Sequence, residues 1–196
     1  MDIQNKNRKL LKKNHVYDET MEHDACGVGL VASTEGLKSR KVVEYGIEAL
    51  KAVWHRGAID ADGKTGDGAG IHIEIPNDFF AEKIEITGHE HDNSDLCVGM
   101  IFLPRNDFGG QEQCRSIVES ELTKKNFNIY GWRQVPVDPS VLGEKAEQTR
   151  PEITQVLFTH NDKSIHGKDL ERALYETRRK IEKEALRNQL NNFYIC

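Results

Sequence analysis

The chain has 196 residues, of which 37% are hydrophobic and 30% are charged, and its formal net charge is -5. Charges of both signs in near balance predict a folded globular protein rather than a disordered chain, and they give no basic surface for nucleic acid. No apolar run approaches the roughly 18 residues that a membrane span needs, and the length favours one domain.

Four cysteines, at positions 26, 97, 114 and 196, are widely and unevenly spaced. They form neither a CxxC pair for zinc nor the dense framework of a small secreted domain, so they predict reduced thiols. Residues 1–14 are basic but precede no apolar segment, so they are not predicted to be a secretory signal, and a short presequence removed by another route stays open. The predicted location is therefore the cytoplasm, and a plastid location stays open.

The first half of the sequence predicts a flexible leader followed by alternating strands and helices. A short apolar run with glycines predicts a strand at Cys26–Ala32, and alternating isoleucines predict another at Ile71–Ile75. Helical spacing of apolar residues predicts helices at Arg40–Trp54 and Asp78–Ile84. The remaining segments are predicted as the leader Met1–Ala25, a turn at Ser33–Ser39, a glycine-rich loop at Asp60–Gly70 and a polar loop at Thr87–Asp95.

The second half predicts three strands, two amphipathic helices and the start of a further strand. The strands are expected at Cys97–Leu103, Asn128–Val137 and Pro151–Thr159, and the helices at Gly110–Lys125 and Lys168–Gln189. The closing residues Asn192–Cys196 predict another strand that has only begun. Because natural domains seldom end in a hydrophobic strand, this ending predicts a fragment of a longer polypeptide.

Cys26 stands between the polar leader and the apolar run, with a small residue on each side. Cleavage of the Ala25–Cys26 peptide bond would leave this cysteine as a free N-terminus. Its α-amino group, with an ordinary pKa of about 8, would then serve as the base for the thiol, so that one residue supplies nucleophile and base. The alternative is a buried core cysteine, since free cysteine is among the most buried residue types.

Two further stretches accompany this cysteine. Trp54–Ala58 places a histidine and an arginine after the predicted helix, and Thr65–Gly70 is a glycine loop that leads into a strand. In this order and spacing, together with Tyr130–Val137 and Asn192–Cys196, these stretches resemble the glutamine amidotransferase domain of the glutamate synthase large subunit. That domain is a class II amidotransferase of the N-terminal-nucleophile hydrolase superfamily, and the resemblance covers Tyr17–Cys196.

The resemblance implies an α+β fold, a four-layer αββα sandwich that is incomplete at its C-terminus. It divides the chain into a propeptide at residues 1–25 and a partial glutamine amidotransferase type 2 domain at residues 26–196. The freed Cys26 thiol would attack the side-chain amide of L-glutamine, release ammonia and form a thioester. Water would then hydrolyse the thioester to glutamate.

Four residues match positions to which the resemblance gives a role. Cys26 matches the nucleophile. Arg56 matches the arginine that bonds the substrate carboxylate or holds the Cys26 end, with a surface ion pair as the alternative. Asp67 and Gly68 are candidates to contact the substrate or the new amino terminus, and a plain turn is the alternative for the aspartate. His55 is expected to be structural, because the α-amino group already serves as the base.

The resemblance also implies oxyanion donors from an Asn-Gly pair, and no Asn-Gly dipeptide occurs in these residues. Loss of one oxyanion donor typically slows an enzyme about a hundredfold or more. The 196 residues by themselves are therefore expected to be weakly active or inactive. The alternative function is a non-catalytic fragment that retains only part of the fold.

No cofactor is expected in this segment, whose cysteines lack the spacing of an iron–sulfur site. For complete glutamate synthases, the resemblance implies FMN and an iron–sulfur cluster in downstream domains of the same chain, which receive the ammonia. Those domains are expected partners, as is a small reductase subunit where the system has one. The sequence leaves open whether the electron donor is a nicotinamide cofactor or ferredoxin.

Two other kinds of binding site, a phosphate loop and a metal site, are alternative interpretations of the sequence. Gly66–Gly70 has the composition of a phosphate loop, but it leads into a strand, whereas phosphate loops open a helix. His89, His91, Asp92 and Asp95 carry metal-ligating groups, but they lack the fixed spacing of a helical metal site. A solvated loop is therefore predicted there, without a metal.

Overall fold

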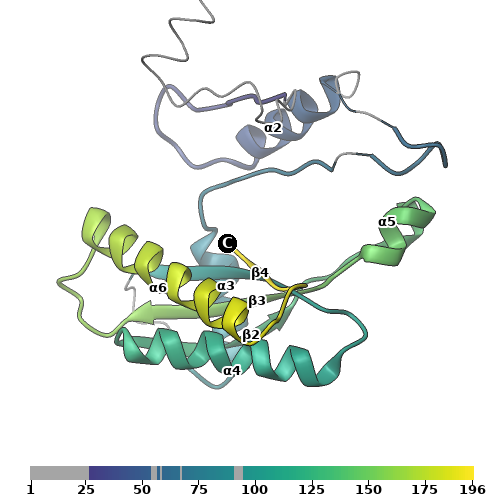
Figure 1. Ribbon diagram of the computed structural model, residues 1–196. Helices are drawn as coiled ribbons and strands as arrows, with labels where there is room; N and C mark the ends of the chain where they lie inside the picture. The colour runs from purple at the N-terminus through teal and green to yellow at the C-terminus, as the bar shows by residue number, and fades with distance from the viewer. Residues whose placement is uncertain (1–26, 54–56, 58, 67, 91–94) are drawn as a thin grey trace, which may run out of the picture. The chain divides into compact units, whose positions relative to one another are not determined.

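The computed structural model describes residues 27–53, 57, 59–66, 68–90 and 95–196. The chain divides into two compact units, which are described here one after the other (Figure 1). The first comprises Met1–Ala58 and Gly66–Ile71, and the second comprises Ile59–Thr65 and His72–Cys196.

The first unit contains the helix α2 (Arg40–Ala52), which confirms the helix predicted at Arg40–Trp54, although Val53 already lies beyond its end. Its apolar side chains are half-buried along one side, whereas Arg40 and Glu44 form an exposed ion pair of 3.2 Å on the other. The side chain of Ile71 lies against α2, where a Cβ on Gly46 would come within 3.2 Å of the Ile71 Cδ1 atom. The helix thus has one apolar side, as its sequence pattern predicts.

The strand predicted at Cys26–Ala32 is not formed in the described residues 27–32. Val28 and Leu30, whose side chains a strand would place on one face, are 91% and 92% exposed. An apolar run becomes a strand when a neighbouring strand accepts and donates its backbone hydrogen bonds, and no described strand pairs with this segment. The turn that follows is confirmed by the hydrogen bond from Gly36 N–H to Ser33 O, 3.2 Å long.

The second unit is built on an antiparallel sheet, whose described strands lie in the order β2-β3-β1-β4. The strands are β1 (Leu96–Leu103), β2 (Phe127–Gln134), β3 (Glu152–His160) and β4 (Tyr194–Ile195). The central pair β1–β3 runs in continuous register from Leu96↔Thr159 to Leu103↔Glu152, while the β2–β3 register shifts between Ile129 and Gly131. All four strands were predicted, with ends that differ by a few residues.

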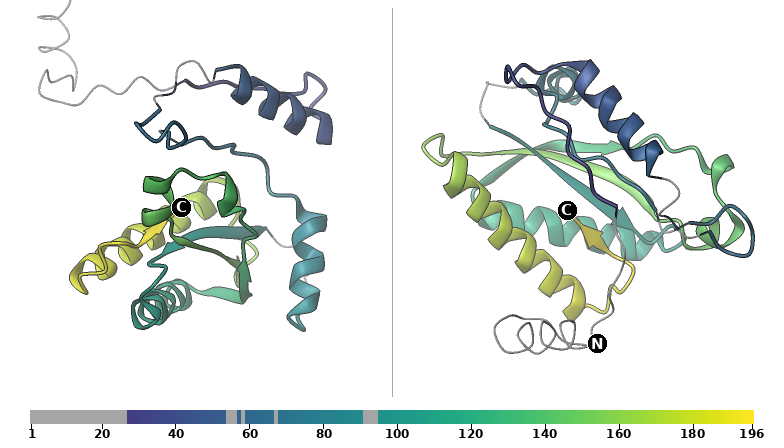
Figure 2. Two further views of the ribbon diagram at one scale, coloured as in Figure 1. Left: turned by 90° about the vertical axis from the view of Figure 1, so that its right-hand side faces the viewer. Right: turned by 90° about the horizontal axis from the view of Figure 1, so that it is seen from above.

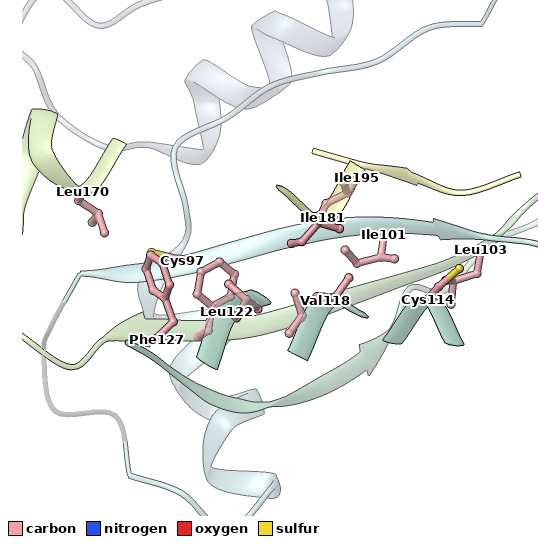
Figure 3. Packing of buried hydrophobic residues seen from close by; sticks show 12 residues of the cluster. Cys97, Ile101, Leu103, Cys114, Val118, Leu122, Phe127, Leu170, Ile181 and Ile195 are labelled. Carbon is pink, nitrogen blue, oxygen red and sulfur yellow. The ribbon is translucent and has the colours of Figure 1, made fainter. Parts of the chain in front are cut away.

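Two long helices cover one face of this sheet: α4 (Phe108–Lys124) and α6 (Gly167–Arg187). The alternate residues Cys97, Ile101 and Leu103 of β1 face the helices, because successive side chains of a strand point to opposite faces. They pack with α4, α6, β2, β3 and β4 in the main hydrophobic core, which is drawn in Figure 3. Both helices confirm the sequence prediction.

The helix α3 (Asn77–Ile86) lies on the opposite face of the sheet (Figure 2, left). Its buried Phe80 and Ile84 pack with Leu96, Tyr130 and Leu157 in a second, smaller cluster. The predicted helix at Asp78–Ile84 is therefore confirmed.

The prediction of a strand at Ile71–Ile75 is wrong, because these residues form no strand. Ile75 packs against the cluster under α3, but Ile73 remains 43% exposed. Alternation of apolar residues indicates a strand only where a partner strand lies alongside. None of the described strands pairs with this segment.

Two short helical segments in the β2–β3 connection were not predicted. They are the 3-10 helix η2 (Pro139–Val141) and the helix α5 (Glu144–Thr149). Asp138 caps η2 by accepting the Ser140 N–H at 3.0 Å. The six residues of α5 carry no apolar stripe, so their helical form depends on contacts with other parts of the unit.

The predicted α+β class is confirmed by this mixture of helices with an antiparallel sheet. Of the expected αββα layers, the described residues supply one sheet and the helix layer of α4 and α6. Within the described ranges, no helix combines the length and the apolar character that crossing a membrane requires.

Candidate active site

Three of the four predicted site residues, Cys26, Arg56 and Asp67, lie outside the described residues, as does His55. The fourth, Gly68, is exposed and has a φ of +88°. That angle lies in the left-handed region, where a side chain is strained, so the position requires glycine. The predicted glycine-rich loop at Asp60–Gly70 contains this positive φ and a second one at Gly63.

Helix α2 ends immediately before the segment that contains Arg56. The Val53 N–H donates to Leu50 O in the last turn, at 3.4 Å, and Lys51 places a positive charge there. A cation in the last turn is favourable because the C-terminal end of a helix is partly negative. The sequence prediction that this helix leads directly into His55–Ala58 is consistent with its observed end at Ala52.

Between Arg56 and Asp67 the chain makes a compact turn, which we call the Asp60–Thr65 loop. The Asp60 N–H donates to Thr65 O at 2.8 Å, and the Gly63 N–H donates to Asp60 O at 2.9 Å. The first bond brings the two ends of the loop together, and the second forms a turn within it. The loop therefore has a defined conformation, although most of its residues are exposed.

The carboxylate of Asp62 organises the inside of this loop. Its Oδ1 atom accepts the backbone N–H groups of Lys64 at 2.9 Å and of Thr65 at 2.7 Å. The Thr65 hydroxyl donates to the Oδ2 atom of the same carboxylate. One side chain thus accepts three hydrogen bonds from two residues.

The pKa of the Asp62 carboxyl lies well below its ordinary value. The Thr65 hydroxyl is the largest cause, followed by the backbone N–H groups of Thr65 and Lys64. The backbone of Lys145, in the first turn of α5, lowers this pKa further. Each donor stabilises the ionised form, so Asp62 is a carboxylate at neutral pH.

The same loop packs against the beginning of α5. Gly143, the N-cap residue of α5, is buried, and a Cβ at this position would come within 3.0 Å of Asp62 Oδ2, Thr65 Oγ1 and Thr65 N. The position therefore requires glycine because of close approach rather than because of its φ of -75°. Lys145 adds an ion pair from its Nζ atom to Asp60 Oδ2, 2.7 Å long.

Helix α5 is in turn held to the sheet unit by Glu147. This carboxylate accepts hydrogen bonds from Arg105, in the β1–α4 connection, and from Arg150, whose Nε atom lies at 2.8 Å. Arg150 and then Arg105 lower the pKa of Glu147. The contacts form a continuous series from the Asp60–Thr65 loop through α5 to the end of β1.

The motif Tyr130–Val137, one basis of the resemblance, lies largely on β2 and has structural contacts. Tyr130 is buried under α3, and Trp132 Nε1 donates to Glu119 of α4 at 2.7 Å. Arg133 donates to Gln155 on β3 at 2.6 Å, and its guanidinium lies 5.2 Å from the centre of the Phe79 ring. The closing motif Asn192–Cys196 contains β4, which pairs with Ile101 and Phe102 of β1.

The rival metal site is only partly described, because His91 and Asp92 lie outside the described residues. His89 Nδ1 instead lies 3.0 Å from the Thr87 hydroxyl. Among the residues with described positions, no group of three His, Cys, Asp or Glu side chains has a metal-binding arrangement.

The Asp62–Thr65 contacts with Gly143 are the part of the site region that sequence reasoning missed. The local signal was present in the order Asp62-Gly63-Lys64-Thr65, because an aspartate often accepts the N–H groups of residues two and three positions later. The partner, Gly143, lies 78 residues beyond Thr65, and no local pattern points to it.

Comparison with known protein families gives a match over residues 26–196 to the family described as glutamine amidotransferases class-II. The matched region begins at Cys26, the residue predicted to be the nucleophile, and continues to the last residue of the chain.

Three relatives show the same similarity. The chain is 51% identical to the large chain of NADPH glutamate synthase from Azospirillum brasilense over 190 residues, which cover 97% of this chain and 12% of the relative. It is 36% identical to ferredoxin-dependent glutamate synthase 2 from Synechocystis sp., over 89% of this chain and 11% of the relative. It is 37% identical to the chloroplastic ferredoxin-dependent glutamate synthase 2 of Arabidopsis thaliana, over 86% of this chain and 10% of the relative.

Proposed function

Because this chain belongs to the class II glutamine amidotransferase family, we propose that it hydrolyses the side-chain amide of L-glutamine, with Cys26 as the nucleophile. The observation that carries this proposal is the family match that starts at Cys26. A match that excludes residues 1–25 supports a propeptide that is removed before the domain acts.

In the proposed reaction, the α-amino group of the freed Cys26 accepts the thiol proton, and the sulfur attacks the amide carbon of glutamine. The carbon–nitrogen bond breaks, the nitrogen takes up the proton and ammonia leaves, so that a thioester remains. Water then attacks the thioester and regenerates the thiol. The sum is glutamine plus water to glutamate plus ammonia, and nucleophile and base come from one residue.

We assign substrate binding to Arg56, Asp67 and Gly68. The Arg56 guanidinium suits the α-carboxylate of glutamine, because two parallel N–H groups match two carboxylate oxygens. Asp67 suits the α-ammonium group of the substrate or of Cys26. The left-handed backbone at Gly68 supports close approach of the chain to a ligand at this point.

The ammonia-supplying part of a glutamate synthase is the wider role that we propose. The named relatives are glutamate synthases, and the chain spans only 10–12% of their length. The synthase activity, the downstream domains, their FMN and iron–sulfur cluster, and a reductase subunit therefore belong to this proposal, as does the cytoplasmic location. Because relatives with both NADPH and ferredoxin in their names match, the electron donor is left open.

The test combines mass spectrometry with covalent labelling of the purified natural polypeptide. We expect a mature mass that begins at Cys26. We also expect one adduct on that residue with diazo-oxo-norleucine, a diazoketone analogue of L-glutamine, and ammonia release from glutamine that Cys26→Ala abolishes. An alanine at position 26 removes only the sulfur, and cleavage before it is checked by the same mass measurement.

An intact Met1 leader together with an unlabelled Cys26 would overturn the proposal and favour the non-catalytic fragment. Comparison of the 196-residue chain with a longer natural polypeptide gives a further check. We expect the longer protein to release ammonia at least about a hundredfold faster, since no Asn-Gly pair is present here to hold an oxyanion.

A further inference from the structure

We infer that Arg133 is the cation of an ion pair that joins the second unit to a further layer of the same polypeptide. That layer covers the part of the sheet that α3 leaves uncovered, and it presents an aspartate or glutamate to the Arg133 guanidinium. We take from the proposed function only that this chain is part of a longer polypeptide, whereas the ion pair does not depend on glutaminase activity.

The two faces of the sheet are covered to different extents. On the face of α4 and α6, Ile101 and Leu103 of β1 are 0% exposed. On the other face, α3 covers only one end, where Leu96 and Leu157 lie in its cluster (Figure 2, left). The rest of that face, which we call the open face, has six side chains from the four described strands: Met100, Phe102, Arg133, Ile153, Gln155 and Tyr194. None of the six belongs to either of the two described clusters.

The composition of the open face differs from that of a sheet surface in contact with water. An antiparallel sheet with one solvated face has polar side chains on that face. Here Phe102 is paired with Ile153 on β3 and with Tyr194 on β4, and the Phe102 and Tyr194 rings are 5.7 Å apart. Tyr194 is nevertheless 58% exposed. Apolar and aromatic side chains that gather on an exposed face indicate a surface that packs against another element.

Arg133 carries the charge of the open face, and its guanidinium is held against the sheet. Its Nη1 atom donates to Gln155 Oε1 at 2.6 Å, and Gln155 Nε2 donates to Met100 Sδ at 3.0 Å. The guanidinium also lies 5.2 Å from the centre of the Phe79 ring on α3. These contacts cross three strands and fix the position of the charge within the second unit.

The contacts of Arg133 include no carboxylate. Among the described residues, no aspartate or glutamate forms an ion pair with its guanidinium, and its Nε and Nη2 atoms donate no hydrogen bond. Covering a guanidinium with apolar groups is strongly unfavourable unless a carboxylate pairs with it. A layer that covers the apolar side chains around Arg133 must therefore supply an acidic side chain, and the two oxygens of a carboxylate suit the guanidinium fork.

The same polypeptide is the source of this layer that the observations favour. The chain spans 10–12% of the length of the named glutamate synthases, so most of a polypeptide of that length lies outside the second unit. A covalently connected segment also reaches the open face at a high effective concentration. The fold that the resemblance implies contains a second sheet, which fits an apolar sheet face, but the resemblance gives Arg133 no partner.

The cover is tested by nitration of tyrosines with tetranitromethane in the longer natural polypeptide, native and unfolded in urea. Tyr175 is the matched control, because it is also 58% exposed but lies on α6, the helix layer of the opposite face. We expect native nitration of Tyr194 to be at least about tenfold slower than in urea, and that of Tyr175 to be slowed only about twofold. Peptide mapping by mass spectrometry gives both rates. A native Tyr194 rate as fast as that of Tyr175 overturns the inference.

The ion pair is tested by carbodiimide cross-linking of the Arg133→Lys variant of the same polypeptide. The carbodiimide activates a carboxyl group, and a contacting lysine amine displaces the activating group and forms an amide. The carbodiimide takes up the elements of water and leaves as a urea. We expect the introduced lysine to be joined to one aspartate or glutamate of the same polypeptide outside residues 59–65 and 72–196, which mass spectrometry of the linked peptides identifies.

Arg105→Lys is the matched control for the cross-link, because Arg105 forms an ion pair with Glu147 inside the second unit. The lysine introduced there should be joined to Glu147. The inference is overturned if this control link forms and Arg133→Lys gives no link, a link within the second unit, or a link to another chain. Neither readout uses glutamine or Cys26. An unlabelled Cys26 together with a protected Tyr194 and the expected link would therefore reject the proposed function alone.

Discussion

Cysteine side chains show how strongly the surroundings of a residue decide its chemistry in this protein. Burial raises the pKa of the Cys97 thiol to about 12, with a smaller effect from Asp95, and it raises that of Cys114 to about 11. Both are free and buried, whereas Cys196 is free and exposed. Since the thiolate is the reactive form, the two buried thiols are inert at neutral pH.

We predict that iodoacetamide at pH 8 alkylates Cys97 and Cys114 at least about a hundredfold more slowly than Cys196 in the native protein. In urea the three rates should converge, because unfolding removes the burial. Peptide mapping by mass spectrometry gives the three rates separately. Rapid native labelling of Cys114 would show that the α4 core is more open than its contacts indicate.

The stability of the folded protein depends on pH through the carboxyl group of Asp62. Its pKa is lowered on folding, so its contribution to stability is fully present above the ordinary aspartate pKa of about 3.9 and declines as the pH falls further. We predict that the melting temperatures of wild type and Asp62→Asn differ at pH 7 and approach each other progressively below pH 4. A constant difference across that range would contradict the depressed pKa.

At the scale of elements, the long helices and the paired strands were predictable because their signals are local and strong. Alternation in β1 and the helical apolar spacing in α4 and α6 each agree with a face that is buried. The segments at 26–32 and 71–75 have similar patterns but no paired strand among the described residues, and the pattern alone carries no information about a partner.

Helix α5 was not predicted, because its sequence carries no local signal for a helix. Its sequence Glu-Lys-Ala-Glu-Gln-Thr has no apolar periodicity, and the contact that holds it comes from Arg105, 42 residues away. The residues of the candidate site also fall into two groups, those indicated by the sequence and those indicated only by tertiary contacts. Cys26, Arg56 and Asp67 follow from motif order and remain predictions, whereas the contact of Asp62 with Gly143 depends on tertiary structure and is visible only in the fold.

The start of α4 provides a prediction for a single element. Asp107 is its N-cap residue and accepts the Gly110 N–H at 2.9 Å. We predict that Asp107→Ala lowers the free energy of unfolding by about 1 kcal/mol, as expected for a lost N-cap, and that Asp107→Asn lowers it by much less. Urea unfolding followed by circular dichroism measures both. Equal losses in the two variants would contradict a capping role.

For the molecule as a whole, the second unit contains the main core. Ile181 of α6 is 1% exposed within that core, whereas Leu186 on the same helix is 73% exposed. We predict that Ile181→Ala lowers the free energy of unfolding by about 2 to 5 kcal/mol, because it leaves a cavity. Leu186→Ala, the matched control, should change it by less than about 0.5 kcal/mol. Equal effects in urea unfolding would contradict the assigned packing of α6.

The strand order of the sheet also has a consequence for synthesis on the ribosome. Strand β1 lies between β3 and β4, yet it is translated first of the four. Its last residue, Leu103, precedes Ile195 of β4 by 92 positions. At typical translation rates, β1 waits roughly 5 to 20 seconds for its second neighbour. During that interval one edge of the apolar strand β1 has no β4 to pair with on the nascent chain, so the sheet is completed only when the last of its four described strands has been made.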